Sequence, residues 1–278
     1  SADDIQTRVD AHMTQELQIR GNVLHILIPV GTLQAGDDVN DFIPSLTGID
    51  LSTGTGWIVV RKDAAGIEHL IRWSSASVGH ITFIADGRGT YTLRNNAKPF
   101  DDIARHWGLK AIGFVTARDL FQGTGLRQFG ASGTMTRAML VTVLHRLDGL
   151  TPAVGASFTD VSKGSWYANA VAWAAANKIV NGLGNGAFGA ANRLTREQLA
   201  VFLYRYADFL GMDTAFTQVL DAYADDDMIS AYALDAMKWA VEKGILTGKT
   251  GNRLDPAGFA DRAEVATMLQ RFVELALK

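Results

Sequence analysis

A helix-start pattern that occurs three times constrains this 278-residue chain more than any other feature. In each copy, a residue suited to capping a helix N-terminus stands directly before an arginine. A glycine lies 14 residues before each arginine: Gly123 before Arg137, Gly182 before Arg196 and Gly248 before Arg262. A fixed period of this length is typical of a repeat array, in which each unit is one small structural module.

The residues around each copy repeat as well. The repeats start at Phe100-Asp101-Asp102, Phe158-Thr159-Asp160 and Tyr223-Ala224-Asp225, and an aromatic follows seven to nine residues later: Trp107, Trp166 and Tyr232. The pattern predicts a first helix that runs to an apolar pair before the glycine, a loop, and a second helix that begins at the arginine. Capping boxes are expected for Thr195 with Gln198 and Asp261 with Glu264. One such unit is too small to bury its apolar stripes, so the three are expected to pack together.

Residues 1–98 follow a different pattern and are predicted to be rich in β-structure. Short alternating or apolar runs separated by glycine turns predict strands at Leu17–Arg20, Val23–Val30, Trp57–Arg61, His69–Trp73, Val78–Ala85 and Thr90–Leu93. Gly21-Asn22 is a hairpin turn pair. Residues 1–13 fit helix or extended chain equally. The predicted fold class is α+β multidomain: a small β-sandwich or sheet domain at 1–98, then repeats at 99–153, 154–217 and 218–278 packed as a pseudo-threefold, mainly α bundle.

Composition excludes several classes of function. The absence of cysteine excludes thiol catalysis, cysteine zinc sites and disulfides. A net charge of −3 does not indicate the basic surface that nucleic-acid binding requires. The sequence contains no run of 18 apolar residues, so no membrane-spanning helix is predicted. No signal peptide opens the chain, and Ser1–Asp4 are expected to be a mature or truncated end. The glycine-rich loop 184–189 follows a predicted helix, so it does not predict a nucleotide site, and we expect no cofactor and no metal.

The repeat resembles S-layer homology domains, through the aromatic-x-Asp start, the later aromatic, the apolar pair before glycine and the Thr-Arg-like helix start. The resemblance covers residues 100–278. It implies a three-pronged spindle that holds a secreted protein non-covalently to the wall of a Gram-positive type bacterium, at the cell surface or S-layer. The implied ligand is a secondary cell-wall polysaccharide, associated with peptidoglycan, that carries ketal-linked pyruvate on an amino sugar. The implied sugar-facing aspartates are Asp102, Asp160 and Asp225.

The physical chemistry of the repeat suits such a ligand. An arginine fork can bind a carboxylate with two hydrogen bonds, and an arginine at the first position of a helix adds the free N–H groups and the dipole of the helix start. A glycine loop lets backbone N–H groups approach closely. The resemblance adds the aspartates, and the aromatics are candidates for contacts with the sugar ring. The predicted ligand-binding residues are Arg137, Arg196, Arg262, Gly123, Gly182, Gly248, Asp102, Asp160, Asp225, Trp107 and Trp166.

Each of these residues also has a purely structural interpretation. The arginines could brace the fold, the glycines could only end the first helices, the aspartates could only cap turns, and the aromatics could belong to the core. We expect the second repeat to bind best and the third, with its acidic run Asp225–Asp227, to bind worst. No catalytic residues are predicted. The alternatives to an anchor are a protein-interaction or S-layer lattice module and a non-catalytic part of an enzyme that acts on wall glycans.

Overall fold

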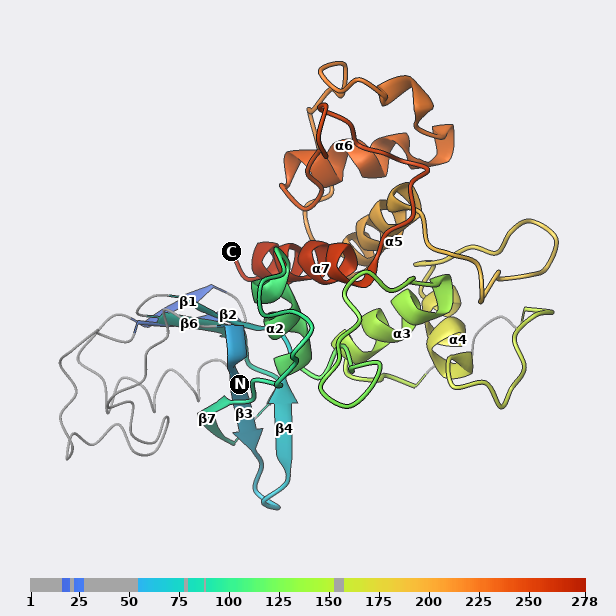
Figure 1. Cartoon of the computed structure of the whole chain (residues 1–278). Coiled ribbons are helices and arrows are strands. Elements are labelled where there is room, and N and C mark those ends of the chain that lie inside the picture. The colour runs from blue at the N-terminus through green and yellow to red at the C-terminus, as the bar shows by residue number, and fades with distance from the viewer. Residues whose placement is uncertain (1–16, 21–22, 28–54, 78–79, 88, 153–157) are drawn as a thin grey trace. The chain divides into compact units, whose positions relative to one another are not determined.

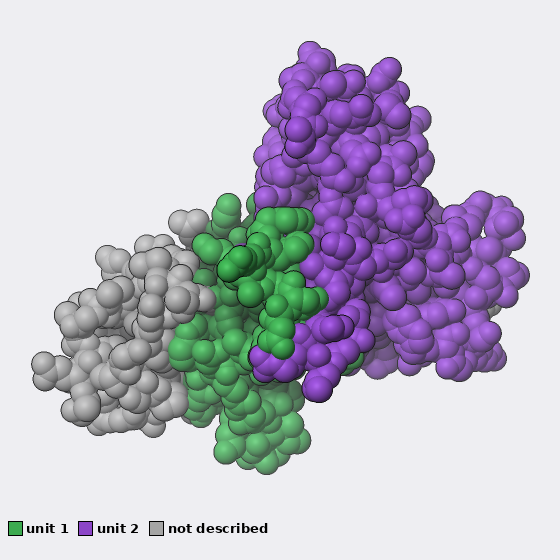
Figure 2. Space-filling model, viewed as in Figure 1, with its two compact units in different colours: residues 1–122, 273–278 green, residues 123–272 purple. Residues whose placement is uncertain are grey.

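The computed structural model describes residues 17–20, 23–27, 55–77, 80–87, 89–152 and 158–278 (Figure 1). They form two compact units, 1–122 with 273–278 and 123–272 (Figure 2). The units divide at residue 122, whereas the predicted repeat array starts at 99. The start of the first repeat therefore folds with the β-rich segment. The predicted limits of the individual repeats stay predictions.

The first unit contains two antiparallel sheets, which confirms the prediction of a β-rich N-terminal segment. A four-stranded sheet has the order β1-β2-β6-β5, from β1 (Leu17–Arg20), β2 (Val23–Leu27), β6 (His80–Ile84) and β5 (Ser74–Ser77). A three-stranded sheet has the order β4-β3-β7, from β4 (Glu68–Ile71), β3 (Trp57–Lys62) and β7 (Thr90–Asn95). Arg20 pairs with Val23, which fits the predicted hairpin; its two turn residues lie outside the described residues.

Strand β5 was not predicted. Its sequence, Ser74-Ser75-Ala76-Ser77, has none of the β-branched or aromatic residues that favour strands. It forms because it pairs with β6 in a hairpin that places Ser74 opposite Phe83. The predicted strand His69–Trp73 ends instead at Ile71, whose carbonyl accepts a 2.8 Å hydrogen bond from the Ser74 hydroxyl.

Helix α2 (Leu109–Ala117) is the first helix of the first repeat, and it packs on β3. Ala117 lies against Ile58 and Val60 in a fully buried cluster. The next residue, Arg118, has no exposed surface: its Nε donates to the Ser74 carbonyl at 2.8 Å and its Nη1 to the Phe114 carbonyl at 3.1 Å. The guanidinium also stacks 3.6 Å from the centre of the Phe114 ring. This arginine joins the helix to the sheet.

The second unit contains the remaining helices of the repeats (Figure 1). They are α3 (Arg137–Leu147), α4 (Ala168–Ala176), α5 (Arg196–Phe209), α6 (Leu234–Glu242) and α7 (Arg262–Ala276), which starts in this unit, with short 3-10 turns η2 (Asp226–Met228) and η3 (Ala231–Ala233). Helices α3, α5 and α7 begin at the three motif arginines, as predicted. This confirms the expected helix–loop–helix organisation.

The caps of these helices differ from one another. The hydroxyls of Thr136 and Thr195 accept the N–H three residues on. Asp261 and Glu264 form a complete capping box: Glu264 N–H donates to Asp261 at 2.8 Å, and Asp261 N–H donates to Glu264 at 3.1 Å. The box predicted for Thr195 and Gln198 is only half formed, because the buried Gln198 Oε1 has no hydrogen-bond partner.

The glycines before the arginines do not end the first helices, so the interpretation of them as helix caps is wrong. Helices α4 and α6 end earlier, at Ala176 and Glu242, and each is followed two residues later by a left-handed residue, Lys178 (φ 58°) or Gly244 (φ 69°). Gly182 is instead a point of close approach. A Cβ there would lie 2.8 Å from the Phe158 ring and 2.7 Å from the Ala187 carbonyl oxygen. The aromatic at the start of the second repeat therefore packs on this glycine, and Tyr223 does the same on Gly248.

The three helix starts interlock in a closed ring. In α3, the Arg137 N–H donates to Asn192 O of the second repeat at 3.0 Å. In α5, the Arg196 N–H donates to Gly258 O of the third at 2.9 Å, and in α7 the Arg262 N–H returns to Gly133 O of the first at 3.1 Å. The next N–H of each helix makes the same kind of bond: Ala138 to Ala190 O, Glu197 to Pro256 O and Ala263 to Ala131 O. The N–H groups predicted to be free for an anion are therefore occupied.

Candidate functional site

Each motif arginine reaches into the loop of the next repeat. The Arg137 Nε donates to Phe188 O at 3.0 Å and its Nη2 to Asn181 O at 3.2 Å. Arg196 makes the equivalent bonds to Leu254 O (2.7 Å) and Thr247 O (3.0 Å), and Arg262 Nε donates to Phe129 O at 3.0 Å. Arg137 and Arg196 therefore each lie beside the glycine of the next repeat, and not beside the glycine that precedes them by 14 residues in their own repeat. These arginines brace the array, but the planar guanidinium has further donors that these bonds do not use.

The aspartates hold the same loops from the other side. Asp160 accepts the N–H groups of Phe188 (2.6 Å), Gly189 (2.7 Å) and Ala190 (3.3 Å). Asp225 accepts those of Leu254 and Asp255, each at 2.8 Å. The carboxylates predicted to face a sugar are therefore hydrogen-bonded to backbone in the second and third repeats. Asp102, in the first unit, is exposed.

These aspartates predict a loss of stability in acid. Desolvation opposes their charge, but the backbone N–H groups outweigh it and hold the pKa of Asp160 and of Asp225 below the ordinary 3.8. A carboxylate whose folded pKa is depressed stabilises the fold above its unfolded pKa, and this contribution is lost as pH falls through the folded pKa. We expect the thermal midpoint to fall between about pH 5 and pH 2.

The matched control is the double variant Asp160→Asn, Asp225→Asn, followed by calorimetry over the same pH range. It should unfold at a lower temperature at neutral pH and depend less on pH than the unmodified chain. Parallel pH curves for the two proteins would show that these carboxylates do not carry the effect.

The later aromatic of each repeat lies at the surface, so the core interpretation is wrong. Trp107 is 64% exposed and Trp166 is 62% exposed. Tyr232 is the equivalent residue of the third repeat, and its hydroxyl donates to Glu197 Oε1 at 2.8 Å. Burial, the hydrogen bond to Glu197 and the charge of Glu197 raise the pKa of Tyr232 to about 12. Glu197 itself is buried and also accepts the N–H and hydroxyl of Ser230.

Tyr232 borders a groove of about 390 Å³ to which all three repeats contribute, hereafter the Arg137 groove. The first repeat supplies Arg137. The second supplies the loop 181–183 and, from α5, Gln198, Val201, Phe202 and Arg205. Burial lowers the pKa of both Arg137 and Arg205, and for Arg137 the neighbouring Arg205 charge adds to this. Neither guanidinium forms an ion pair with a carboxylate of the described residues, and the Asp160 carboxylate acts on Arg137 only from a distance, so both arginines give the groove positive charge.

Arg205 was not predicted, although the sequence holds a signal for it. An arginine stands nine residues after the motif arginine in every repeat: Arg146, Arg205 and Arg271. The spacing places it on the same helix as the motif arginine of its own repeat. The fold then brings it to the motif arginine of the preceding repeat.

A family model, the S-layer homology domain, matches residues 99–138, 157–200 and 222–266. The chain carries three S-layer homology domains. The matched segments agree with the three repeats that the arginine and glycine spacing predicts. S-layer homology domains anchor surface proteins to the cell wall and bind its polysaccharide, which places this protein at the cell surface.

The relatives are surface proteins and glycan-acting enzymes that carry such domains. The chain is 30% identical to an amylopullulanase of Thermoanaerobacterium thermosulfurigenes over 72% of this chain and 11% of that protein. It is 27% identical to the exoglucanase XynX of Acetivibrio thermocellus over 98% of this chain and 26% of that protein. An S-layer protein of Bacillus thuringiensis subsp. finitimus is 30% identical over 53% of this chain and 17% of its own. The chain thus spans between 11% and 26% of the length of these relatives.

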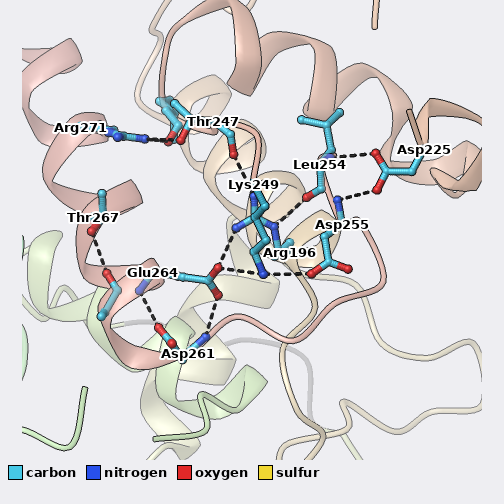
Figure 3. Close-up of polar contacts among 12 residues, drawn as sticks. Arg196, Asp225, Thr247, Lys249, Leu254, Asp255, Asp261, Glu264, Thr267 and Arg271 are labelled. Atoms are coloured by element: carbon cyan, nitrogen blue, oxygen red, sulfur yellow. Dashed lines mark hydrogen bonds and ion pairs between the residues drawn. The ribbon is translucent and has the colours of Figure 1, made fainter. Parts of the chain in front are cut away.

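The arginine of the second S-layer homology domain has a different electrostatic environment (Figure 3). Arg196 Nη1 lies 3.0 Å from Glu264 Oε1, which is also 3.1 Å from Lys249 Nζ. Lys249 in turn pairs with Asp255 at 2.9 Å. The charge of Arg196 is therefore neutralised within the protein. The ranking of Arg196 above Arg262 stays a prediction, but the Arg137 groove is the better candidate site.

Two further kinds of site find no support in the part of the chain that the structure describes. Its histidine, aspartate and glutamate side chains form no group of three that could hold a metal ion. None of its helices combines the length and the apolar character that crossing a membrane requires.

Proposed function

We propose that the Arg137 groove binds an acidic sugar of the cell-wall polysaccharide, an amino sugar with ketal-linked pyruvate, and that this contact anchors the protein to the wall. The observation that carries the proposal is the pair Arg137 and Arg205, which line one groove without a carboxylate partner among the described residues. A pyruvate ketal offers a single fixed carboxylate on an otherwise neutral sugar. A partly desolvated guanidinium pair binds such a group with charge-assisted hydrogen bonds.

The other residues of the groove suit the rest of the sugar. Leu183, which is 47% exposed, and the Tyr232 ring offer surfaces for the apolar face of a pyranose. The buried Gln198 Oε1 lacks a donor, and an acetamido N–H or a hydroxyl of the sugar would supply one. Each of these contacts contributes only modest binding free energy. A polymer that presents many such sugars is bound more tightly, because the effective concentration of further sugars is high once one is bound.

We further propose that the chain itself is not catalytic. Hydrolysis of a glycoside commonly needs two carboxyl groups that flank the scissile bond. The Arg137 groove is lined by arginine, amide and apolar side chains, and the nearby Glu197 is already bound to Tyr232 and Ser230. The enzyme names among the relatives fit a catalytic part elsewhere in those longer proteins.

Cosedimentation tests the proposed function directly. Wall polysaccharide is prepared in two forms, one intact and one treated with mild acid to remove the ketal pyruvate, and each is coupled to beads. The full chain should bind the intact form and lose most of its binding to the treated form. Re-attachment of pyruvate to the treated polysaccharide should restore binding. Equal binding to both forms would overturn the pyruvate specificity.

A further inference from the structure

The fourth residue of the helix-start motif differs in all three domains: Met139, Gln198 and Glu264. In the second and third domains, the fold places this residue beside the arginine of the preceding domain. Gln198, of the second domain, lines the groove of Arg137, of the first. Glu264, of the third domain, contacts Arg196, of the second, at 3.0 Å. The motif therefore contributes to two sites, with its arginine at one and its fourth residue at the other.

The chemical difference between Gln198 and Glu264 changes the charge at these two sites. The Glu264 carboxylate lies between Arg196 and Lys249, where an incoming carboxylate would have to bind, and only 14% of its side chain is exposed (Figure 3). Its second oxygen is held by the Asp261 N–H, which fixes it in place. Gln198 is neutral and leaves Arg137 without an ion pair among the described residues. The glutamate acts as an internal substitute for the ligand, and the glutamine does not.

We infer that this fourth position determines which S-layer homology domain sites accept an anion. Glutamine at 198 keeps the Arg137 groove open, and glutamate at 264 closes the Arg196 site by occupying its arginine. The inference rests on the proposed function, since it concerns how carboxylate-bearing sugars are selected among similar sites. It makes residues 198 and 264 specificity-determining residues for an acidic glycan.

A reciprocal exchange tests the inference. The probe is the methyl glycoside of an N-acetylated amino sugar carrying a pyruvate ketal, titrated calorimetrically into the full chain. Gln198→Glu should weaken binding at least about tenfold, because a new ion pair with Arg137 competes with the ligand. The variant should fold, since glutamate at this position completes the capping box that Thr195 begins. Asn169→Asp, which adds the same charge outside the groove on the exposed face of α4, should bind as the unmodified chain does.

The opposite exchange, Glu264→Gln, should add a binding site. The stoichiometry should rise by about one sugar per chain, because Arg196 loses its internal carboxylate. An additional Arg196→Ala replacement should remove the added site and leave the first. An unchanged stoichiometry in Glu264→Gln, together with unchanged affinity in Gln198→Glu, would overturn the inference while leaving the proposed function intact.

A measurement without ligand tests the inference about residues 198 and 264 independently of the proposed function. In nitrogen-15 spectra, a guanidinium paired with a carboxylate shows slower exchange of its Nη protons and slower rotation about Nε–Cζ. Gln198→Glu should slow both for Arg137, and Glu264→Gln should speed both for Arg196. If the unmodified chain does not bind the sugar probe, the proposed function is wrong. The spectra still test the inference, because they show whether residues 198 and 264 control the ion pairs of Arg137 and Arg196. Unchanged spectra in both variants would overturn it.

Discussion

Replacement of Arg137 by alanine is expected to lower the affinity of the chain for the pyruvylated sugar by roughly 10- to 150-fold. A hydrogen bond between charged groups contributes about 1.5–3 kcal/mol, and this is the free energy that the variant loses. Arg137 also binds Phe188 O and Asn181 O, so the variant should unfold more easily as well. The affinity is measured by calorimetry, and the thermal midpoint is recorded in parallel.

Arg205→Ala separates binding from folding. Arg205 lines the same groove, but it makes no hydrogen bond or ion pair within the described residues, so its loss should weaken binding with little change in the thermal midpoint. Arg271→Ala is the matched control, because Arg271 occupies the equivalent position in the third domain and binds Ile245 O instead. Full affinity in Arg205→Ala would show that the groove does not hold the carboxylate.

Replacement of Arg118 by methionine is expected to destabilise the first unit by about 2 to 5 kcal/mol. Methionine keeps much of the volume but leaves the buried carbonyls of Ser74 and Phe114 without their donor. The cost of unsatisfied buried acceptors, and not a cavity, then determines the result. Hydrogen exchange followed by mass spectrometry should show faster exchange in α2 and β3 together.

The control for this variant is Arg105→Ala, which removes an exposed arginine that precedes α2. It should leave the exchange of α2 and β3 unchanged. Faster exchange in α2 with no change in β3 would contradict the conclusion that the first helix of the first S-layer homology domain folds with the sheet.

Local features of the site could be predicted from the sequence because they depend on neighbouring residues. A capping threonine or aspartate fixes where a helix begins, so Arg137, Arg196 and Arg262 were correctly placed at helix starts. Amphipathic periodicity likewise predicted the helices. What these patterns do not contain is the partner of each arginine, since spacing within a repeat says nothing about which repeat lies beside it.

That missing information explains the corrections. Each arginine was expected to face its own glycine loop, but the ring of helix starts shifts every contact by one domain. The same ring occupies the first N–H groups of α3, α5 and α7, which a helix considered alone would leave free. Asp160 and Asp225 were assigned to the ligand on the resemblance to the family. Their true partners are backbone N–H groups of a loop about 30 residues further along the chain, which the local pattern does not contain. Arg205 was recognisable only once both sides of the groove were known.

A crystal of the full chain soaked with the pyruvylated methyl glycoside tests the central claim most directly. We predict density for the sugar in the Arg137 groove, with the ketal carboxylate within hydrogen-bonding distance of Arg137 and Arg205 and the ring against Tyr232. The Arg196 site should stay empty, with Glu264 still in place. A sugar bound at Arg196 with the Arg137 groove empty, or a carboxylate turned away from both arginines, would contradict the account.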